Sequence, residues 1–318
     1  MLTLNNKIKT YTLNTKNIIP SIGLGTWLAF DDDAYNAIRV AIANGYRLID
    51  CAARYNNERI IGKAINDAIK AGDVKREELF ITSKLWNDSH KQDDVKIAFE
   101  KSLKDLGLDY IDLYMMHWPV AIEKGTNAPI SLKELPLQIT WEAMTKLLEK
   151  SYLIDVGVAN FSIKKLELLK NEGLLTPVVN QVEINLYFQQ KKLIEYCKRN
   201  NIIPMAAAPL SSQSRAVKPE GEKNPFEDSV VEFLANKYSI TKAQLILSFL
   251  LTKDIIIIPK STNQQRIVEN YNSVFVKLEQ DDIAMLSNLD QNKRVFPGQG
   301  MIKGDYTYEN LWDEKYDE

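Results

Sequence analysis

Short apolar runs alternate along the chain with segments in which apolar residues recur at helical spacing. The run at residues 255–258 is four consecutive isoleucines, apolar on both faces, as a strand buried inside a parallel sheet should be. The other runs are similarly short and apolar. We therefore predict strands over residues 22–25, 46–50, 79–85, 110–116, 153–158, 178–182, 202–206 and 255–258.

The segments between these strands each carry one apolar face. In the first, Ala34, Ala37, Ile38, Ala41 and Ile42 follow the spacing of an amphipathic helix. Acidic residues at 31–33 suit the start of that helix, and the glycine at 45 suits its end. The same pattern predicts further helices over residues 60–69, 95–106, 140–150, 162–171, 189–200, 228–238, 241–251 and 263–270.

Eight alternating strand–helix units predict an α/β fold, a (β/α)8 TIM barrel, formed as a single domain over residues 1–318. A doubly wound sheet is the competing architecture. Its usual glycine fingerprint is incomplete here, because Leu28 stands where a third glycine should follow Gly23 and Gly25. Residues 7–12 alternate in polarity, so we expect an N-terminal hairpin that closes the bottom of the barrel.

Composition excludes several classes of protein. The chain has 40 Lys and Arg against 42 Asp and Glu, whereas a nucleic-acid binder would show a basic excess. The two histidines and two cysteines form no cluster with metal-ligand spacing, so we expect no metal. Residues 1–10 are polar, unlike a signal peptide, and the longest apolar stretch is too short to cross a membrane. We therefore expect a cytoplasmic protein.

Four side chains suited to proton chemistry lie at or just after predicted strand ends, where barrel enzymes build their active sites. Lys84 ends one strand and Asp50 another, and a buried lysine needs such a partner. Tyr55 follows Asp50 by one loop, and a nearby ammonium would lower the pKa of a tyrosine below about 10 and suit it to proton donation. His117 ends a third strand, where a neutral imidazole could donate a hydrogen bond to a substrate oxygen.

Each of these residues also has an ordinary structural interpretation. The lysine could reach solvent, the aspartate could cap a turn, the histidine could be structural, and the tyrosine could be one of 14 that pack in the chain. The four together at neighbouring strand ends are harder to explain by structure alone. A second group, Lys260, Ser261 and Arg266, opens a helix after a strand and suits a phosphate, although Lys260 alone would indicate only a solvated helix start.

The chain resembles the aldo-keto reductase superfamily over essentially its full length. Order and spacing match at residues 45–50 (GYRLID), 55–58 (YNNE), 82–87 (TSKLWN), 112–114 (DLY), 117–119 (HWP), 156–161 (VGVANF), 180–183 (NQVE) and 258–261 (IPKS). The resemblance implies a catalytic tetrad of Asp50, Tyr55, Lys84 and His117, with Tyr55 as the general acid in carbonyl reduction.

The resemblance also implies NADPH or NADP+ as the cofactor, with Lys260, Ser261 and Arg266 at its 2′-phosphate, and Asn160 and Gln181 at the carboxamide. The full set that it places at the cofactor is Thr26, Asp50, Asn160, Gln181, Leu210, Lys260, Ser261, Arg266, Glu269 and Asn270. The set that it places around the substrate is Trp27, Trp86, His117 and Trp118. The tail from residue 294 resembles the family's extended C-terminal loop, which shapes the pocket, and its aromatic residues are Phe296, Tyr306, Tyr308, Trp312 and Tyr316.

Five positions depart from the family pattern. Ala207 stands where an aromatic residue usually stacks on the nicotinamide, and Ala159 where a serine is usual. Leu28 and Ser214 replace a lysine and an aspartate that often close a loop over the pyrophosphate. We expect weaker binding of the cofactor as a result. Asn56 replaces a glycine, and because asparagine tolerates a left-handed backbone, the turn should survive.

The expected function is NADPH-dependent reduction of an aldehyde or ketone to an alcohol by a monomer or weak dimer. The expected partner is a small carbonyl compound, with no nucleic acid and no membrane. Ala207 and Ala159 leave open a catalytically weak barrel that acts as a binding or regulatory subunit. A phosphosugar isomerase is a third possibility, disfavoured because such an enzyme needs a carboxylate base, whereas this mouth centres on Tyr55 and Lys84.

Overall fold

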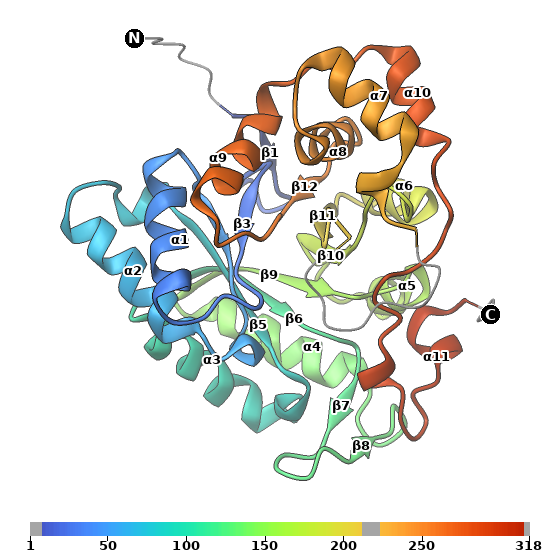
Figure 1. Ribbon diagram of the computed structural model, residues 1–318. Helices are drawn as coiled ribbons and strands as arrows, with labels where there is room; N and C mark the ends of the chain where they lie inside the picture. Colours follow the sequence, from blue (N-terminus) through green and yellow to red (C-terminus); the bar gives the residue numbers. More distant parts are fainter. Residues whose placement is uncertain (1–7, 212–222, 315–318) are drawn as a thin grey trace.

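The computed structural model describes residues 8–211 and 223–314, and its central feature is a barrel of parallel strands (Figure 1). Within those residues, eight strands are hydrogen-bonded in the order β3-β4-β5-β6-β9-β10-β11-β12. The two end strands meet through a bridge between Ile22 and Ile257, so the sheet closes on itself and the doubly wound alternative is excluded. The strands are β3 (Gly23–Gly25), β4 (Leu48–Asp50), β5 (Phe80–Leu85), β6 (Ile111–Met116), β9 (Leu153–Ala159), β10 (Val179–Glu183), β11 (Ile203–Ala207) and β12 (Ile256–Ile257).

Helices follow the strands and cover the outside of the barrel (Figure 1). They are α1 (Asp31–Ala43), α2 (Glu58–Lys70), α3 (Gln92–Leu106), α4 (Leu137–Thr145), α5 (Ile163–Asn171), α6 (Lys191–Arg199), α7 (Ser229–Tyr238), α8 (Lys242–Leu251), α9 (Gln264–Asn272), α10 (Gln280–Ser287) and α11 (Tyr308–Trp312). The predicted alternation of strands and helices is confirmed. The sequence pattern missed α10, α11 and a short hairpin of β7 (Ala121–Ile122) and β8 (Pro129–Ile130).

Alternate residues of the strands face two separate apolar cores. The larger core lies between the barrel and its helices, and the smaller one includes Leu48, Leu113 and Met205 from three strands. Leu13 and Ile19 join the smaller core from the N-terminal hairpin, in which β1 (Thr10–Thr12) pairs antiparallel with β2 (Ile18–Pro20). The predicted hairpin is therefore present, although residue 7 lies outside the described residues.

The chain after α10 runs back across the molecule and packs beside the β7–β8 hairpin (Figure 1). The hydroxyl of Tyr306 accepts a hydrogen bond from the Ala121 amide at 3.1 Å and donates one to the Ile130 carbonyl at 2.8 Å. Asp313, just beyond α11, forms an ion pair of 2.9 Å with Lys165 of α5. These contacts attach the extended C-terminal segment to the barrel. None of the described helices is long and apolar enough to cross a membrane.

Candidate active site

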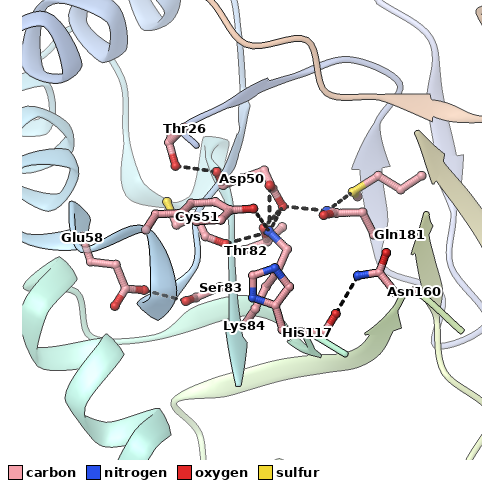
Figure 2. A network of polar contacts seen from close by, with 12 residues as sticks. Thr26, Asp50, Cys51, Glu58, Thr82, Ser83, Lys84, His117, Asn160 and Gln181 are labelled. Carbon is pink, nitrogen blue, oxygen red and sulfur yellow. Dashed lines mark hydrogen bonds and ion pairs between the residues drawn. The ribbon is translucent and has the colours of Figure 1, made fainter. Parts of the chain in front are cut away.

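Lys84 is the centre of a buried polar cluster at the mouth of the barrel (Figure 2). Its side chain is 0% exposed, and its ammonium donates to both carboxylate oxygens of Asp50 at 2.8 Å. It also donates to the Cys51 carbonyl at 2.9 Å and to the Tyr55 hydroxyl at 3.5 Å. Because β4 and β5 are neighbouring parallel strands, their ends bring these groups together. The predicted pairing of Lys84 with Asp50 is present.

Asp50 has further donors from other strands of the barrel (Figure 2). One of its carboxylate oxygens accepts hydrogen bonds from the Thr82 hydroxyl at 2.7 Å and from the Gln181 amide at 2.8 Å. Its backbone carbonyl accepts from the Thr26 hydroxyl at 2.8 Å. A buried carboxylate is stable only when its oxygens are satisfied in this way. These hydrogen bonds fix the Asp50 carboxylate, which in turn holds the Lys84 ammonium in place.

Tyr55 and His117 complete the group. Tyr55 ends a short 3-10 turn, η1 (Ala53–Tyr55), and its ring centre lies 5.8 Å from that of His117. Asn56 follows with a φ of 55°, so the turn does use the left-handed backbone that asparagine tolerates. His117 comes directly after β6, and its carbonyl accepts a hydrogen bond from the Asn160 amide at 2.8 Å.

One electrostatic expectation is wrong. Burial raises the pKa of Tyr55 to about 12, and the charge of Lys84 offsets this rise only in part. Burial is the largest single influence on the pKa of Lys84 and lowers it, but the charge and hydrogen bond of Asp50, together with Tyr55, make the net shift upward. Burial lowers the pKa of His117 well below its usual value, and the charges of Lys84 and Arg54 add to this. At neutral pH the tyrosine therefore keeps its proton and the imidazole is neutral.

A cavity of about 730 Å³ opens beside this group. The predicted residues that line it are Thr26, Trp27, Asp50, Tyr55, Trp86, His117, Trp118, Asn160, Gln181, Leu210, Lys260, Ser261, Arg266 and Asn270. Lys84 does not line the cavity itself, but it contacts Asp50 and Tyr55, which do. Glu269 is not part of this lining and accepts a hydrogen bond from Gln265 at 2.7 Å. The predicted catalytic, cofactor and substrate groups thus meet around one cavity, apart from Glu269 and the fully buried Lys84.

The start of α9 forms a basic part of the cavity wall. Asn263 caps this helix by accepting from the Arg266 amide at 3.0 Å, and Ser261 accepts from the Asn263 amide at 3.1 Å. Burial lowers the pKa of Lys260, an effect that Asp33 opposes and Arg266 reinforces. Lys260 and Arg266 form no ion pair with a carboxylate of the described residues. Two such cations at a helix N-terminus suit a phosphate group.

The departures from the family pattern can be located around the cavity. Ala207 ends β11 and lines the cavity, so the wall carries a methyl group at this position. Leu28 also lines it, with a left-handed φ of 58° and 39% of its surface exposed. Ala159 is buried at the end of β9. Ser214 lies outside the described residues.

Several cavity residues were not singled out from the sequence. Among them are Arg54, directly before Tyr55, and Glu183, which ends β10. The Glu183 carboxylate accepts from the amides of Val295 at 2.7 Å and Phe296 at 2.8 Å, which places Phe296 in the cavity wall. Phe296 then meets Trp27 edge to face, with ring centres 5.6 Å apart. The acidic residue in the NQVE segment was the available signal for this anchor.

Similarity to known proteins identifies this barrel as an oxidoreductase. The model of the Aldo/keto reductase family matches residues 21–291, and the chain belongs to this family. No group of three or more His, Cys, Asp or Glu side chains in residues 8–211 and 223–314 is arranged to hold a metal ion.

The chain is similar to reductases from distant organisms. It is 38% identical to Aldo/keto reductase slr0942 of Synechocystis sp., over 97% of this chain and 98% of that protein. It is also 38% identical to methylglyoxal reductase DkgA of Escherichia coli, over 92% of this chain and 97% of the relative. The crystal structure of a Bombyx mori aldo-keto reductase in complex with NADP matches with a TM-score of 0.82 and 36% identity, covering 91% of this chain and 95% of that one.

Proposed function

We propose that this aldo/keto reductase reduces an aldehyde or ketone to the alcohol with NADPH, and that Tyr55 is the general acid. The observation that carries the proposal is the buried Lys84 ammonium, which contacts both the Asp50 carboxylate and the Tyr55 hydroxyl. Tyr55 and His117 line the same cavity. A carbonyl oxygen placed between them could accept hydrogen bonds from both side chains.

The proton transfer follows from the charges around Tyr55. As the carbonyl carbon is reduced, its oxygen develops alkoxide character and takes the proton of the tyrosine hydroxyl. The phenolate left behind is stabilised by the ammonium of Lys84, and Asp50 keeps that ammonium in place. His117 stays neutral and orients the carbonyl by donating a hydrogen bond, without competing as an acid. Solvent then returns a proton to Tyr55.

The residues of the cavity fit NADPH. Lys260 and Arg266, with the N-terminus of α9, would hold the 2′-phosphate, and Asn160 and Gln181 would hold the carboxamide. When bound, NADPH supplies the hydride that reduces the carbonyl carbon. The Bombyx mori relative in complex with NADP supports this choice of cofactor. Glu269, which does not line the cavity, would lie near the adenine.

The experiment that tests this function measures NADPH and NADH oxidation by the purified chain with a panel of aldehydes, aldoses and ketones. We expect NADPH oxidation that depends on the carbonyl compound and is slower with NADH. Tight NADPH binding without turnover of any carbonyl compound would instead indicate a binding or regulatory subunit. The complete tetrad argues against that second function, because a binding protein has no need of a buried Lys–Asp pair beside a tyrosine.

A further inference from the structure

Arg54 lies in the part of the cavity where the carbonyl group would bind. It is an exposed residue of η1, directly before Tyr55, and it lines the cavity. Its guanidinium carbon lies 5.2 Å from the centre of the Trp86 ring. The ring centre of His117 also lies 5.2 Å from that of Trp86. The guanidinium and the imidazole are therefore neighbours of the same tryptophan.

The guanidinium of Arg54 has no hydrogen-bond or ion-pair partner in the described part of the chain. Five other arginines there form ion pairs with carboxylates: Arg39 with Asp73, Arg59 with Asp105, Arg76 with Asp112, Arg199 with Glu195, and Arg294 with Glu314. Arg54 forms no such pair and donates no hydrogen bond within residues 8–211 and 223–314, as its only described contact is with the Trp86 ring. Its planar fork of N–H groups is thus available to a ligand.

Both of the carboxylates that line the cavity already have partners within the described residues. Asp50 is paired with Lys84, and Glu183 accepts two backbone amides of the C-terminal segment. Asp88, two residues after Trp86, accepts from the Ser89 hydroxyl at 2.9 Å. The charge of Arg54 also contributes to the lowered pKa of His117. None of these carboxylates forms an ion pair with Arg54, so its guanidinium remains available to an anionic ligand.

We propose that Arg54 binds an anionic group of the substrate, so that this enzyme prefers aldehydes and ketones that carry a carboxylate or a phosphate. This inference rests on the proposed carbonyl reduction and adds the class of substrate. The Trp86 ring holds the guanidinium by a cation–π contact, which uses none of its N–H groups, so these can bind an anion bidentately. Since Trp86 contacts both Arg54 and His117, we place the anionic group about one aromatic ring away from the carbonyl oxygen.

Matched pairs of substrates test this inference. The first pair is 4-carboxybenzaldehyde and its uncharged methyl ester, and the second is glyceraldehyde 3-phosphate and glyceraldehyde. For each pair the readout is the ratio of kcat/KM for the anionic member to that for the neutral member. We expect Arg54→Met to lower this ratio about tenfold, mainly through KM of the anion, as for loss of a charge-assisted contact at a partly exposed site. Arg54→Lys keeps the charge but not the planar fork of N–H groups, so it should retain only part of the ratio.

A matched control is Arg59→Met, which removes the same charge a few residues away. The Arg59 side chain is 83% exposed and pairs with Asp105, so the wild-type ratio should persist. A fall in the first pair alone identifies a carboxylate, and a fall in the second alone identifies a phosphate. In wild-type protein, salt should raise KM for the anionic member and leave KM for the neutral member unchanged, which checks the inference without a variant.

Two results would overturn the role of Arg54. One is an unchanged ratio in both pairs for Arg54→Met, with the neutral members still reduced. The other is a wild-type enzyme that prefers the neutral member of both pairs. This measurement needs no variant, so it decides the question even if Arg54→Met fails to fold. In either case carbonyl reduction itself survives. Failure of the wild-type protein to reduce any of the four compounds would instead count against the proposed function.

Discussion

Removing one member of the buried Asp50–Lys84 pair should destabilise the fold strongly. Their side chains are 2% and 0% exposed, and the ammonium donates to both carboxylate oxygens at 2.8 Å. In Lys84→Met, Asp50 keeps its hydrogen bonds from Thr82 and Gln181 but loses its counter-charge. Breaking a buried pair in this way typically costs about 3 to 5 kcal/mol in the free energy of unfolding. That is a large part of the roughly 5 to 15 kcal/mol of an ordinary protein.

The double variant separates the ion pair from the packing of its members. Asp50→Asn alone leaves the Lys84 ammonium buried without its carboxylate, so it should also be costly. Combining Asp50→Asn with Lys84→Met removes both charges, and we expect it to be about 2 kcal/mol less destabilised than the sum of the single variants. The sign follows from the geometry, because neither charge then remains buried without its partner.

The assay is equilibrium unfolding in urea, followed by tryptophan fluorescence and far-UV circular dichroism, whose transitions must coincide for two-state analysis. Lys63→Met is a matched control, because Lys63 pairs with Asp67 on the surface and its side chain is 61% exposed. It should cost less than about 1 kcal/mol. Additive single-variant losses, or a Lys84→Met no more costly than Lys63→Met, would show that the buried pair does not stabilise the fold as an ion pair.

Three further predictions concern the cofactor and pH. Arg266→Ala or Lys260→Ala should weaken NADPH by about 1.5 to 3 kcal/mol and NADH far less, in titrations of cofactor fluorescence; equal losses would mean that the phosphate site is misplaced. Ala207→Tyr should tighten NADPH by roughly 0.5 to 1.5 kcal/mol through stacking, and an unchanged Kd in folded protein would contradict this. With the pKa of His117 lowered, kcat/KM for a neutral aldehyde should be flat from about pH 6 to pH 9. Because the unfolded state binds this proton more readily, stability should fall only as the pH drops below about 6.5, and an activity limb near 6.5 would count against a neutral His117.

The fold and most of the site could be predicted because they follow from periodicity and from strand ends. The two-residue strands β7 and β8 are too short to show alternation, and α10 has only Asp282 and Leu286 buried, so it lacks the apolar stripe that marks a helix. The pKa of Tyr55 was predicted with the wrong sign because burial and the charge of Lys84 act in opposite directions, and only the structure shows which is larger. The sequence shows that Arg54 is charged but not that it lacks a partner.

The most direct test of the account is Tyr55→Phe, which removes the hydroxyl and keeps the ring. We expect kcat for carbonyl reduction to fall by about 10² to 10⁴-fold, the usual worth of a general acid, while the Kd for NADPH stays near the wild-type value. Tyr110→Phe serves as the control, because its ring packs under Arg76 away from the cavity. Turnover close to that of the wild type in Tyr55→Phe, with NADPH still bound, would contradict the assignment of Tyr55 as the proton donor.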